Sequence, residues 1–308
     1  MEYTNQRTAF GETLVELGKE NKDIVVLDAD LGGSTMGKLF ELEYPDRHFE
    51  MGIAEANMLS VSAGLAQTGK IPVANSFAVF AAGRAFDQIR QTIAIGKLNV
   101  KIGGSSAGLS DFGDGATHQS VDDMAIMSAI PNMTVICPAD GNEMVGATKA
   151  MMEYDGPVYI RINRNDYDNT TKADQPFVIG QPSVVKEGNE IVVFATGYMV
   201  GVAKRAAEAM KDEVSVKVVN VSTIKPLNAD KIIELVGDCK AVITVEEHSV
   251  IGGLGAGVAR ALCKECKPIE MLGMQDVFGC SGHNYDELLE HFHLTEEAVV
   301  EAIRKMNK

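Results

Sequence analysis

The sequence predicts an α/β protein built from two doubly wound domains that are joined by a polar linker. Short runs of β-branched residues alternate with helical patterns in both halves of the 308-residue chain. Such alternation predicts mainly parallel sheets with helices on both faces, and this length suits about two domains. We therefore expect a first domain at residues 1–165, a linker at 166–182 and a second domain at 183–308.

The first half contains five predicted strands and five predicted helices. The strands are DIVVLDAD, IPVANSF, NVKIGG, MTVICPAD and PVYIRI, and the helices lie near Thr8–Glu20, Ala54–Gln67, Gly83–Ile95, Asp122–Ala129 and Asn142–Glu153. In a parallel sheet of this kind, functional groups gather in the loops at the carboxyl ends of the strands. We therefore look for the site in the loops of this half.

The second half repeats the alternation after the turn-rich segment NRNDYDNTTKADQPFVIGQP, which is the best candidate for a linker. Its predicted strands are EIVVFATG, VSVKVVN, AVITVEEH and PIEMLGM, and its helices lie near Val200–Met210, Asp230–Leu235, Gly257–Cys266 and the C-terminal EEAVVEAIRKMNK. The glycine-rich GGLGAG departs from a nucleotide-binding GxGxxG because Val258 occupies the position of the last glycine. We therefore expect this half to be mainly structural.

The composition limits the classes of function. Asp and Glu outnumber Lys and Arg by 43 to 28, which gives a formal net charge of −15. This balance argues against binding to nucleic acids or to anionic membranes, although a few local arginines can still hold a small anionic substrate. Five scattered cysteines suit a reducing compartment. Without a signal pattern or a long apolar run, we expect a soluble cytoplasmic protein.

One short stretch, MGIAEANMLSVSAGLAQTG, raises a specific question. Glu55 is its only charged residue, in a helix that is otherwise apolar or small on every side. Such a helix is normally buried, and a buried carboxylate without a partner costs several kcal/mol or stays protonated. The alternative is an exposed glutamate in a first helical turn, which the helix dipole favours.

The motifs that follow identify a family. After GIAEANM come IPVANSFAVFAAG, GRAFDQIRQTIA and SSAGLSDFGDGATHQSVDD, in this order. In these motifs and their spacing the chain resembles the pyrimidine-binding half of transketolases, and the likeness continues to its C-terminus. More distantly, it is similar to deoxyxylulose-phosphate synthases and to the beta subunits of pyruvate-type dehydrogenases.

The resemblance implies a role for Glu55 as the group that binds N1′ of the aminopyrimidine of thiamine diphosphate. A carboxyl group in an apolar pocket can share a proton with that nitrogen, which helps to activate the thiazolium carbon. The resemblance also implies that Phe80 stacks on the pyrimidine and that Phe77 lines the pocket, although core packing remains the alternative for both rings. Asp30 matches a residue near the cofactor across the subunit interface.

The resemblance further implies contacts with the substrate. His118 matches a histidine at the carbonyl and hydroxyl region of the donor, where an imidazole can exchange a proton, and Asp114 matches a contact to a hydroxyl. Ser106 stands where transketolases usually carry another histidine, which leaves the identity of the sugar open. Arg7, Ser34 and Arg161 resemble the clamp for the substrate phosphate, since guanidinium groups pair bidentately with phosphate oxygens.

The resemblance also implies a partner. The GDG at residues 113–115 lacks the asparagine pair that completes a magnesium site, so we assign no metal ligand to this chain. A whole transketolase would be about twice as long. We therefore expect this chain to be the C-terminal subunit of a split transketolase, with thiamine diphosphate and Mg²⁺ (or Ca²⁺) held by an N-terminal subunit, in a complex of two copies of each. The uncharged stretch Ile71–Gly83 is then expected to be an interface.

The leading hypothesis is transfer of a two-carbon ketol unit from a ketose phosphate to an aldose. A second enzyme hypothesis is a synthase of the deoxyxylulose-phosphate type or a 2-oxo-acid dehydrogenase beta subunit, and the phosphate clamp disfavours the oxo-acid version. A third is a catalytically silent regulatory subunit, which the presence of both Glu55 and His118 argues against.

Overall fold

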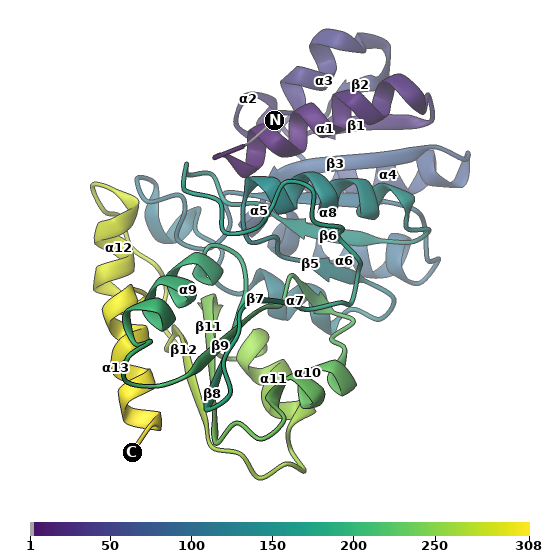
Figure 1. The fold of residues 1–308 in the computed structure, drawn as a ribbon. Helices are drawn as coiled ribbons and strands as arrows, with labels where there is room; N and C mark the ends of the chain where they lie inside the picture. Colours follow the sequence, from purple (N-terminus) through teal and green to yellow (C-terminus); the bar gives the residue numbers. More distant parts are fainter. Residues whose placement is uncertain (1–2) are drawn as a thin grey trace.

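The computed structural model describes residues 3–308, which form two sheets with helices around them (Figure 1). Both sheets are mainly parallel, because most neighbouring strands are connected through helices. The predicted α/β class with two doubly wound sheets is confirmed.

The first sheet has seven strands in the order β10-β5-β6-β4-β3-β1-β2. Its strands are β1 (Ile24–Asp28), β2 (His48–Glu50), β3 (Ile71–Phe77), β4 (Lys101–Ser105), β5 (Thr134–Ile136), β6 (Val158–Arg161) and β10 (Thr223–Lys225). Its helical segments are α1 (Gln6–Glu20), α2 (Gly32–Thr35), α3 (Gly37–Glu43), η1 (Pro45–Arg47), α4 (Glu55–Gln67), α5 (Ala78–Arg84), α6 (Phe86–Gln88), η2 (Ile89–Ala94), η3 (Gly115–Thr117), α7 (Asp123–Ala129) and α8 (Gly141–Glu153). All of its strand pairs are parallel except β10 with β5.

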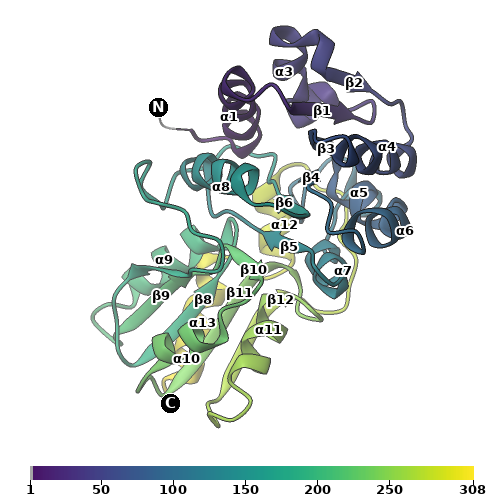
Figure 2. The same cartoon turned by 90° about the vertical axis from the view of Figure 1, so that its right-hand side faces the viewer.

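The second sheet has five strands in the order β12-β11-β8-β9-β7. Its strands are β7 (Ser183–Lys186), β8 (Ile191–Ala195), β9 (Val216–Asn220), β11 (Ala241–Ser249) and β12 (Ile269–Met274). Its helices are α9 (Met199–Ala209), α10 (Ala229–Val236), α11 (Leu254–Ala261), α12 (Tyr285–His291) and α13 (Glu296–Met306). Figure 2 shows α11 beside β12.

The apolar core is continuous between the two halves. One cluster of buried side chains joins α4, α5 and α7 of the first half to α10, α11 and β8 of the second half. A separate cluster packs α1 and α8 against the other face of the first sheet. The two halves therefore share a core, and side chains of the second half can support loops of the first.

Several elements differ from the sequence prediction. The three- and four-residue strands β2, β7 and β10 were not predicted, nor was α12. The helix expected over Gly83–Ile95 is divided into the end of α5, the short α6 and the π-helical segment η2. The expected interface at Ile71–Gly83 is wrong for most of its length, because β3 is a central strand and its residues are largely buried within the chain.

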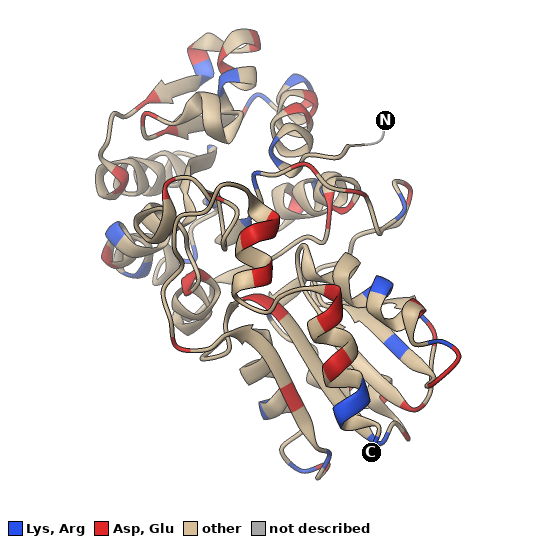
Figure 3. Cartoon of the chain, turned by 90° about the vertical axis from the view of Figure 1, so that its left-hand side faces the viewer, with Lys and Arg blue, Asp and Glu red and all other residues tan. Residues whose placement is uncertain are grey.

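The charge distribution follows the acidic composition. Asp and Glu residues mark α12 and the first part of α13, whereas Arg304 and Lys305 lie at the end of α13 (Figure 3). Within residues 3–308, no helix combines the length and the apolar character that crossing a membrane would require.

Candidate active site at the carboxyl ends of β3 and β4

The structure buries Glu55 at the beginning of α4. Glu55 is the first residue of the helix and is only 3% exposed, and Met58 and Leu59 in the following turn are completely buried. Arg84 Nη1 donates a hydrogen bond to Glu55 Oε1 at 3.1 Å. Arg84 lies at the end of α5, and its side chain is 52% exposed. The buried acid is therefore paired with a cation that solvent can reach.

Three rings, from β3, α5 and the turn after η3, gather beside this pair. Phe77 ends β3 and Phe80 lies in the first turn of α5, with their rings stacked at 6.0 Å between centroids. The ring of His118 packs edge-on against both, at 5.2 Å from Phe80 and 6.2 Å from Phe77. The structure thus brings Glu55, Phe77, Phe80 and His118 into one cluster, which we call the ring pocket.

Arg84 joins the two sides of the ring pocket. While it donates to Glu55, its guanidinium carbon lies 4.0 Å from the centroid of the Phe80 ring. The residue spacing carries a signal for this arrangement that the motif comparison missed, since Arg84 follows Phe80 by four residues and so shares its helix face. A side chain added at Gly83, which is exposed, would meet no heavy atom within 4 Å.

A second group of polar residues lies at the N-terminal end of α1. Arg7 Nη1 donates to the carbonyl oxygen of Ser34 at 3.1 Å, so two predicted clamp residues are in contact. Burial, together with the positive charge of the nearby Arg164, lowers the pKa of Arg7. Arg164 is itself paired with Asp111. Arg7 and Arg164 therefore lie near each other, with Asp111 and Asp166 also close to Arg7.

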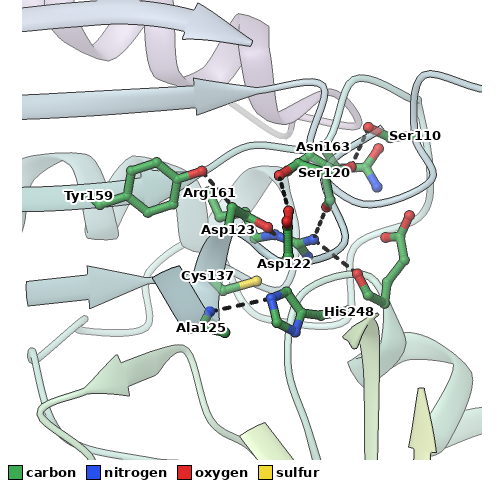
Figure 4. A network of polar contacts seen from close by, with 12 residues as sticks. Ser110, Ser120, Asp122, Asp123, Ala125, Cys137, Tyr159, Arg161, Asn163 and His248 are labelled. Carbon is green, nitrogen blue, oxygen red and sulfur yellow. Dashed lines mark hydrogen bonds and ion pairs between the residues drawn. The ribbon is translucent and has the colours of Figure 1, made fainter. Parts of the chain in front are cut away.

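Arg161 is not part of the expected phosphate clamp. It is only 5% exposed, and its Nε donates to both carboxylate oxygens of Asp123, at 3.2 and 3.0 Å. Its Nη2 donates to the carbonyl oxygens of Ser120 and Glu247, as the network in Figure 4 shows in part. Because Arg161 is buried and its Nε and Nη2 already donate to these oxygens, it is not positioned to bind a substrate phosphate. Arg164, three residues further along, is the arginine that lies near Arg7.

The remaining predicted residues lie in different surroundings. Asp114 is exposed and leads into η3, the short turn before His118. Ser106 is fully buried with a φ of 52°, and its Oγ has no hydrogen-bond partner within residues 3–308. Asp30 is exposed with a φ of 59°, and its backbone N–H donates to Glu50.

Unpartnered polar atoms collect around the carboxyl ends of β3 and β4. The side chains of Asn75, Ser76 and Ser105 are buried and lack hydrogen-bond partners within the described chain, as does the Nε of Arg7. Buried polar groups are nearly always paired, so such a concentration indicates a region that meets ligand or water. Across residues 3–308, no group of three or more His, Cys, Asp or Glu side chains is arranged to hold a metal ion.

Comparisons with known proteins identify the family. Residues 3–170 match the family described as "Transketolase, pyrimidine binding domain", and residues 180–299 match "Transketolase, C-terminal domain". A protein of Methanocaldococcus jannaschii described as a transketolase C-terminal section is 44% identical, over 99% of this chain and 97% of the relative. A 6-deoxy-6-sulfo-D-fructose transketolase subunit of Clostridium sp. is 38% identical, over 98% and 94%.

The solved structures include a close neighbour. It is titled "Split gene transketolase, inactive beta4 tetramer", and it aligns with a TM-score of 0.90 and 42% identity over 99% of each chain. The two family matches together cover most of the sequence. The chain therefore belongs to the transketolase family, in which it corresponds to a C-terminal subunit with the pyrimidine-binding and C-terminal domains.

Proposed function

We propose that this chain is the C-terminal subunit of a thiamine-diphosphate-dependent transketolase that transfers a two-carbon ketol unit between sugars. The observation that carries the proposal is the ring pocket, in which a buried glutamate, an aromatic face and a histidine meet. A binding-only subunit would have no need to bury a carboxylate beside a titratable imidazole.

The ring pocket fits the aminopyrimidine of the cofactor. Arg84 offers Glu55 a planar N–H donor and covers the face of Phe80 at the same time. An aminopyrimidine is also planar and can make both contacts, so it would replace the guanidinium group. Once bound, the cofactor would supply the nucleophilic carbon that attacks the ketose carbonyl. Glu55 would hold the pyrimidine by sharing a proton at its ring nitrogen, and Phe77 and Phe80 would exclude water.

The other residues of the site would bind the substrate. His118 borders the same rings and would exchange a proton with the carbonyl or hydroxyl oxygen of the ketose, while Asp114 accepts from a hydroxyl. Arg7 and Arg164 would hold the distal anionic group with Ser34, while Asp30 would face the cofactor across the subunit boundary. In this proposal Arg164 takes the clamp position that the motif comparison assigned to Arg161.

The substrate class follows from the clamp. One relative is named for 6-deoxy-6-sulfo-D-fructose, a ketose with an anionic group at the end opposite its carbonyl. A pair of arginines suits either a phosphate or a sulfonate there. We therefore propose a ketose donor with a terminal anion.

The proposal requires a second polypeptide. We propose that an N-terminal transketolase subunit binds the diphosphate through Mg²⁺ or Ca²⁺ and that two copies of each chain assemble in the reducing cytoplasm. Relatives described as a section or a subunit of transketolase support a division of the enzyme between two chains.

Reconstitution tests the proposal. The chain is mixed with an N-terminal transketolase subunit, thiamine diphosphate and Mg²⁺, and transfer is measured from a panel of ketose phosphates and a sulfoketose. We expect Glu55→Gln to lower kcat at least about 100-fold, as expected for a lost proton-sharing group. The exposed Glu153→Gln serves as the matched control. Full activity of Glu55→Gln in a complex that binds cofactor normally would refute the proposal.

A further inference from the structure

Two segments of the first half face the proposed substrate. We call residues 105–121, which carry Asp114 and His118, the substrate loop, and residues 163–165 around Arg164 the clamp segment. In the proposed function, one contacts the reacting end of the ketose and the other its distal anion. Their separation therefore has to match the length of the donor.

Glu247, near the end of β11 in the second half, fixes the beginning of the substrate loop. Its Oε1 accepts a hydrogen bond from the backbone N–H of Leu109 at 2.6 Å. Gly108 packs so closely that an added Cβ would lie 2.5 Å from the carboxyl carbon of Glu247, and its φ is 64°. Glu247 is 4% exposed, so water does not compete for these contacts.

Tyr285, the first residue of α12, extends this contact to the clamp segment. Its hydroxyl donates to Glu247 Oε2 at 2.8 Å and accepts from Asn163 Nδ2 at 2.9 Å. Asn163 Oδ1 in turn accepts from the N–H of Asn165, which closes the clamp segment around Arg164. One chain of hydrogen bonds thus runs from Leu109 through Glu247 and Tyr285 to Asn163.

Further contacts tie the substrate loop to both the clamp segment and the second half. Asn165 Nδ2 donates to the carbonyl oxygen of Ser110 at 3.1 Å. Gln119 Nε2 donates to the carbonyl oxygen of Cys280 at 2.9 Å. The N–H of Gly282 donates to the carbonyl oxygen of Phe112, also at 2.9 Å. The loop therefore rests on the C-terminal domain at several points along its length.

We propose that Glu247 and Tyr285 are positioning residues that set the distance between His118 and the anion clamp, so that the C-terminal domain determines the length of the accepted ketose. This inference rests on the proposed function, since it assigns the two segments to one substrate. Neither residue touches the reacting atoms. Their effect is transmitted by the backbone of Leu109 and the side chain of Asn163.

Tyr285→Phe tests the inference in the reconstituted complex. It keeps the buried ring and removes the hydroxyl that joins Asn163 to Glu247. We expect the KM of a donor with a terminal anion to rise about three- to tenfold, the range for one lost hydrogen bond. The KM of the corresponding donor without the anion, kcat and the Kd of the cofactor should stay within about twofold, because that donor does not span both segments.

Tyr167→Phe is the matched control, because Tyr167 belongs to the same aromatic cluster but its hydroxyl donates to the carbonyl oxygen of Ala139. Glu247→Gln is the second variant, since its amide retains only one acceptor oxygen for two donors. Equal KM changes for both donors, or equal effects of Tyr285→Phe and Tyr167→Phe, would overturn the inference.

Hydrogen exchange in the chain without partner keeps this test separate from the test of function. We expect Tyr285→Phe and Glu247→Gln, but not Tyr167→Phe, to speed amide exchange in residues 105–121 several-fold. If the wild-type complex transfers no ketol unit, the proposed function fails, whereas unchanged exchange in the substrate loop refutes the positioning role itself.

Discussion

Two carboxylate–arginine pairs in this chain have opposite exposure. In the ring pocket, the buried Glu55 is paired with Arg84, whose side chain is 52% exposed. In the second pair, Asp123 and Arg161 both belong to the first half, where it contacts the second, and their side chains are 0% and 5% exposed. Asp123 also accepts from Tyr159 Oη at 2.8 Å, so its environment is completed on several sides.

The difference indicates which pair can open. An exposed guanidinium that leaves its partner is solvated by water, whereas a buried one is not. Arg84 can therefore leave Glu55 when another planar donor arrives. Arg161 cannot leave Asp123 without disturbing the contact between the two halves.

The largest expected effect comes from breaking the buried pair. Arg161→Met should lower the free energy of unfolding by about 3–5 kcal/mol, because Asp123 would remain buried without its cation. Urea unfolding of the chain without partner measures this. Arg84→Met is the comparison variant and should lower stability less than Arg161→Met does, because it removes a single hydrogen bond to Glu55, whereas Arg161→Met removes several hydrogen bonds between buried groups. Similar losses for the two variants would contradict the comparison.

A buried acid that forms no ion pair with an arginine gives an intermediate effect. Glu246 accepts from the N–H groups of Leu254 and Gly255 at the beginning of α11, and burial raises its pKa from 4.5 to about 7, against the opposing effect of these hydrogen bonds. Burial likewise raises the pKa of Glu247 to about 7. In both cases the folded state binds the proton more tightly than the unfolded state.

These two carboxyl groups make the free energy of unfolding depend on pH. The stabilisation from these protonated groups is fully present below about pH 4.5 and is lost as the pH rises through about 7. We expect the free energy of unfolding to fall between about pH 5 and 7, with Glu246 contributing about 1–3 kcal/mol of that fall. Glu246→Gln should flatten the pH profile, and a profile as steep as that of the wild type would count against a raised pKa.

The smallest expected effect concerns the exposed partner. If Arg84 occupies the place of the aminopyrimidine, Arg84→Ala should tighten the apparent Kd of thiamine diphosphate in the complex about two- to fivefold, because a half-exposed pair contributes at most about 1 kcal/mol. Titration by intrinsic fluorescence or calorimetry measures this Kd. Arg90→Ala, at another exposed arginine of the same region, is the control. Weaker binding in Arg84→Ala would show that the guanidinium assists the cofactor instead.

Sequence patterns predicted the strands whose own residues form a buried apolar run. The buried runs of β1, β3, β8 and β11 are rich in apolar residues, Val and Ile above all, so these strands could be predicted. Strand β10 has only one apolar residue among its three positions, so no pattern marks it, and its pairing is decided by tertiary contacts.

The candidate site, like the fold, could be predicted from the sequence only in part. The apolar surroundings of Glu55 were evident from its neighbours, and the structure buries it as expected, while Phe80 and His118 pack together beside its partner Arg84. The choice between Arg161 and Arg164 was not evident, because it depends on a carboxylate from another segment, Asp123. Spacing can locate an arginine near the end of a strand, but it does not reveal which partner the folded chain brings to it.

Strand β10 has a consequence for any division of this chain. It comes from the second half, yet it pairs with β5 at the border of the first sheet, with Thr223 opposite Ile136 and Lys225 opposite Val135. A fragment cut within residues 166–182 would lose that cover and expose a row of unpaired backbone groups, which invites aggregation. A chimera that exchanges C-terminal halves between relatives would likewise have to preserve this strand register.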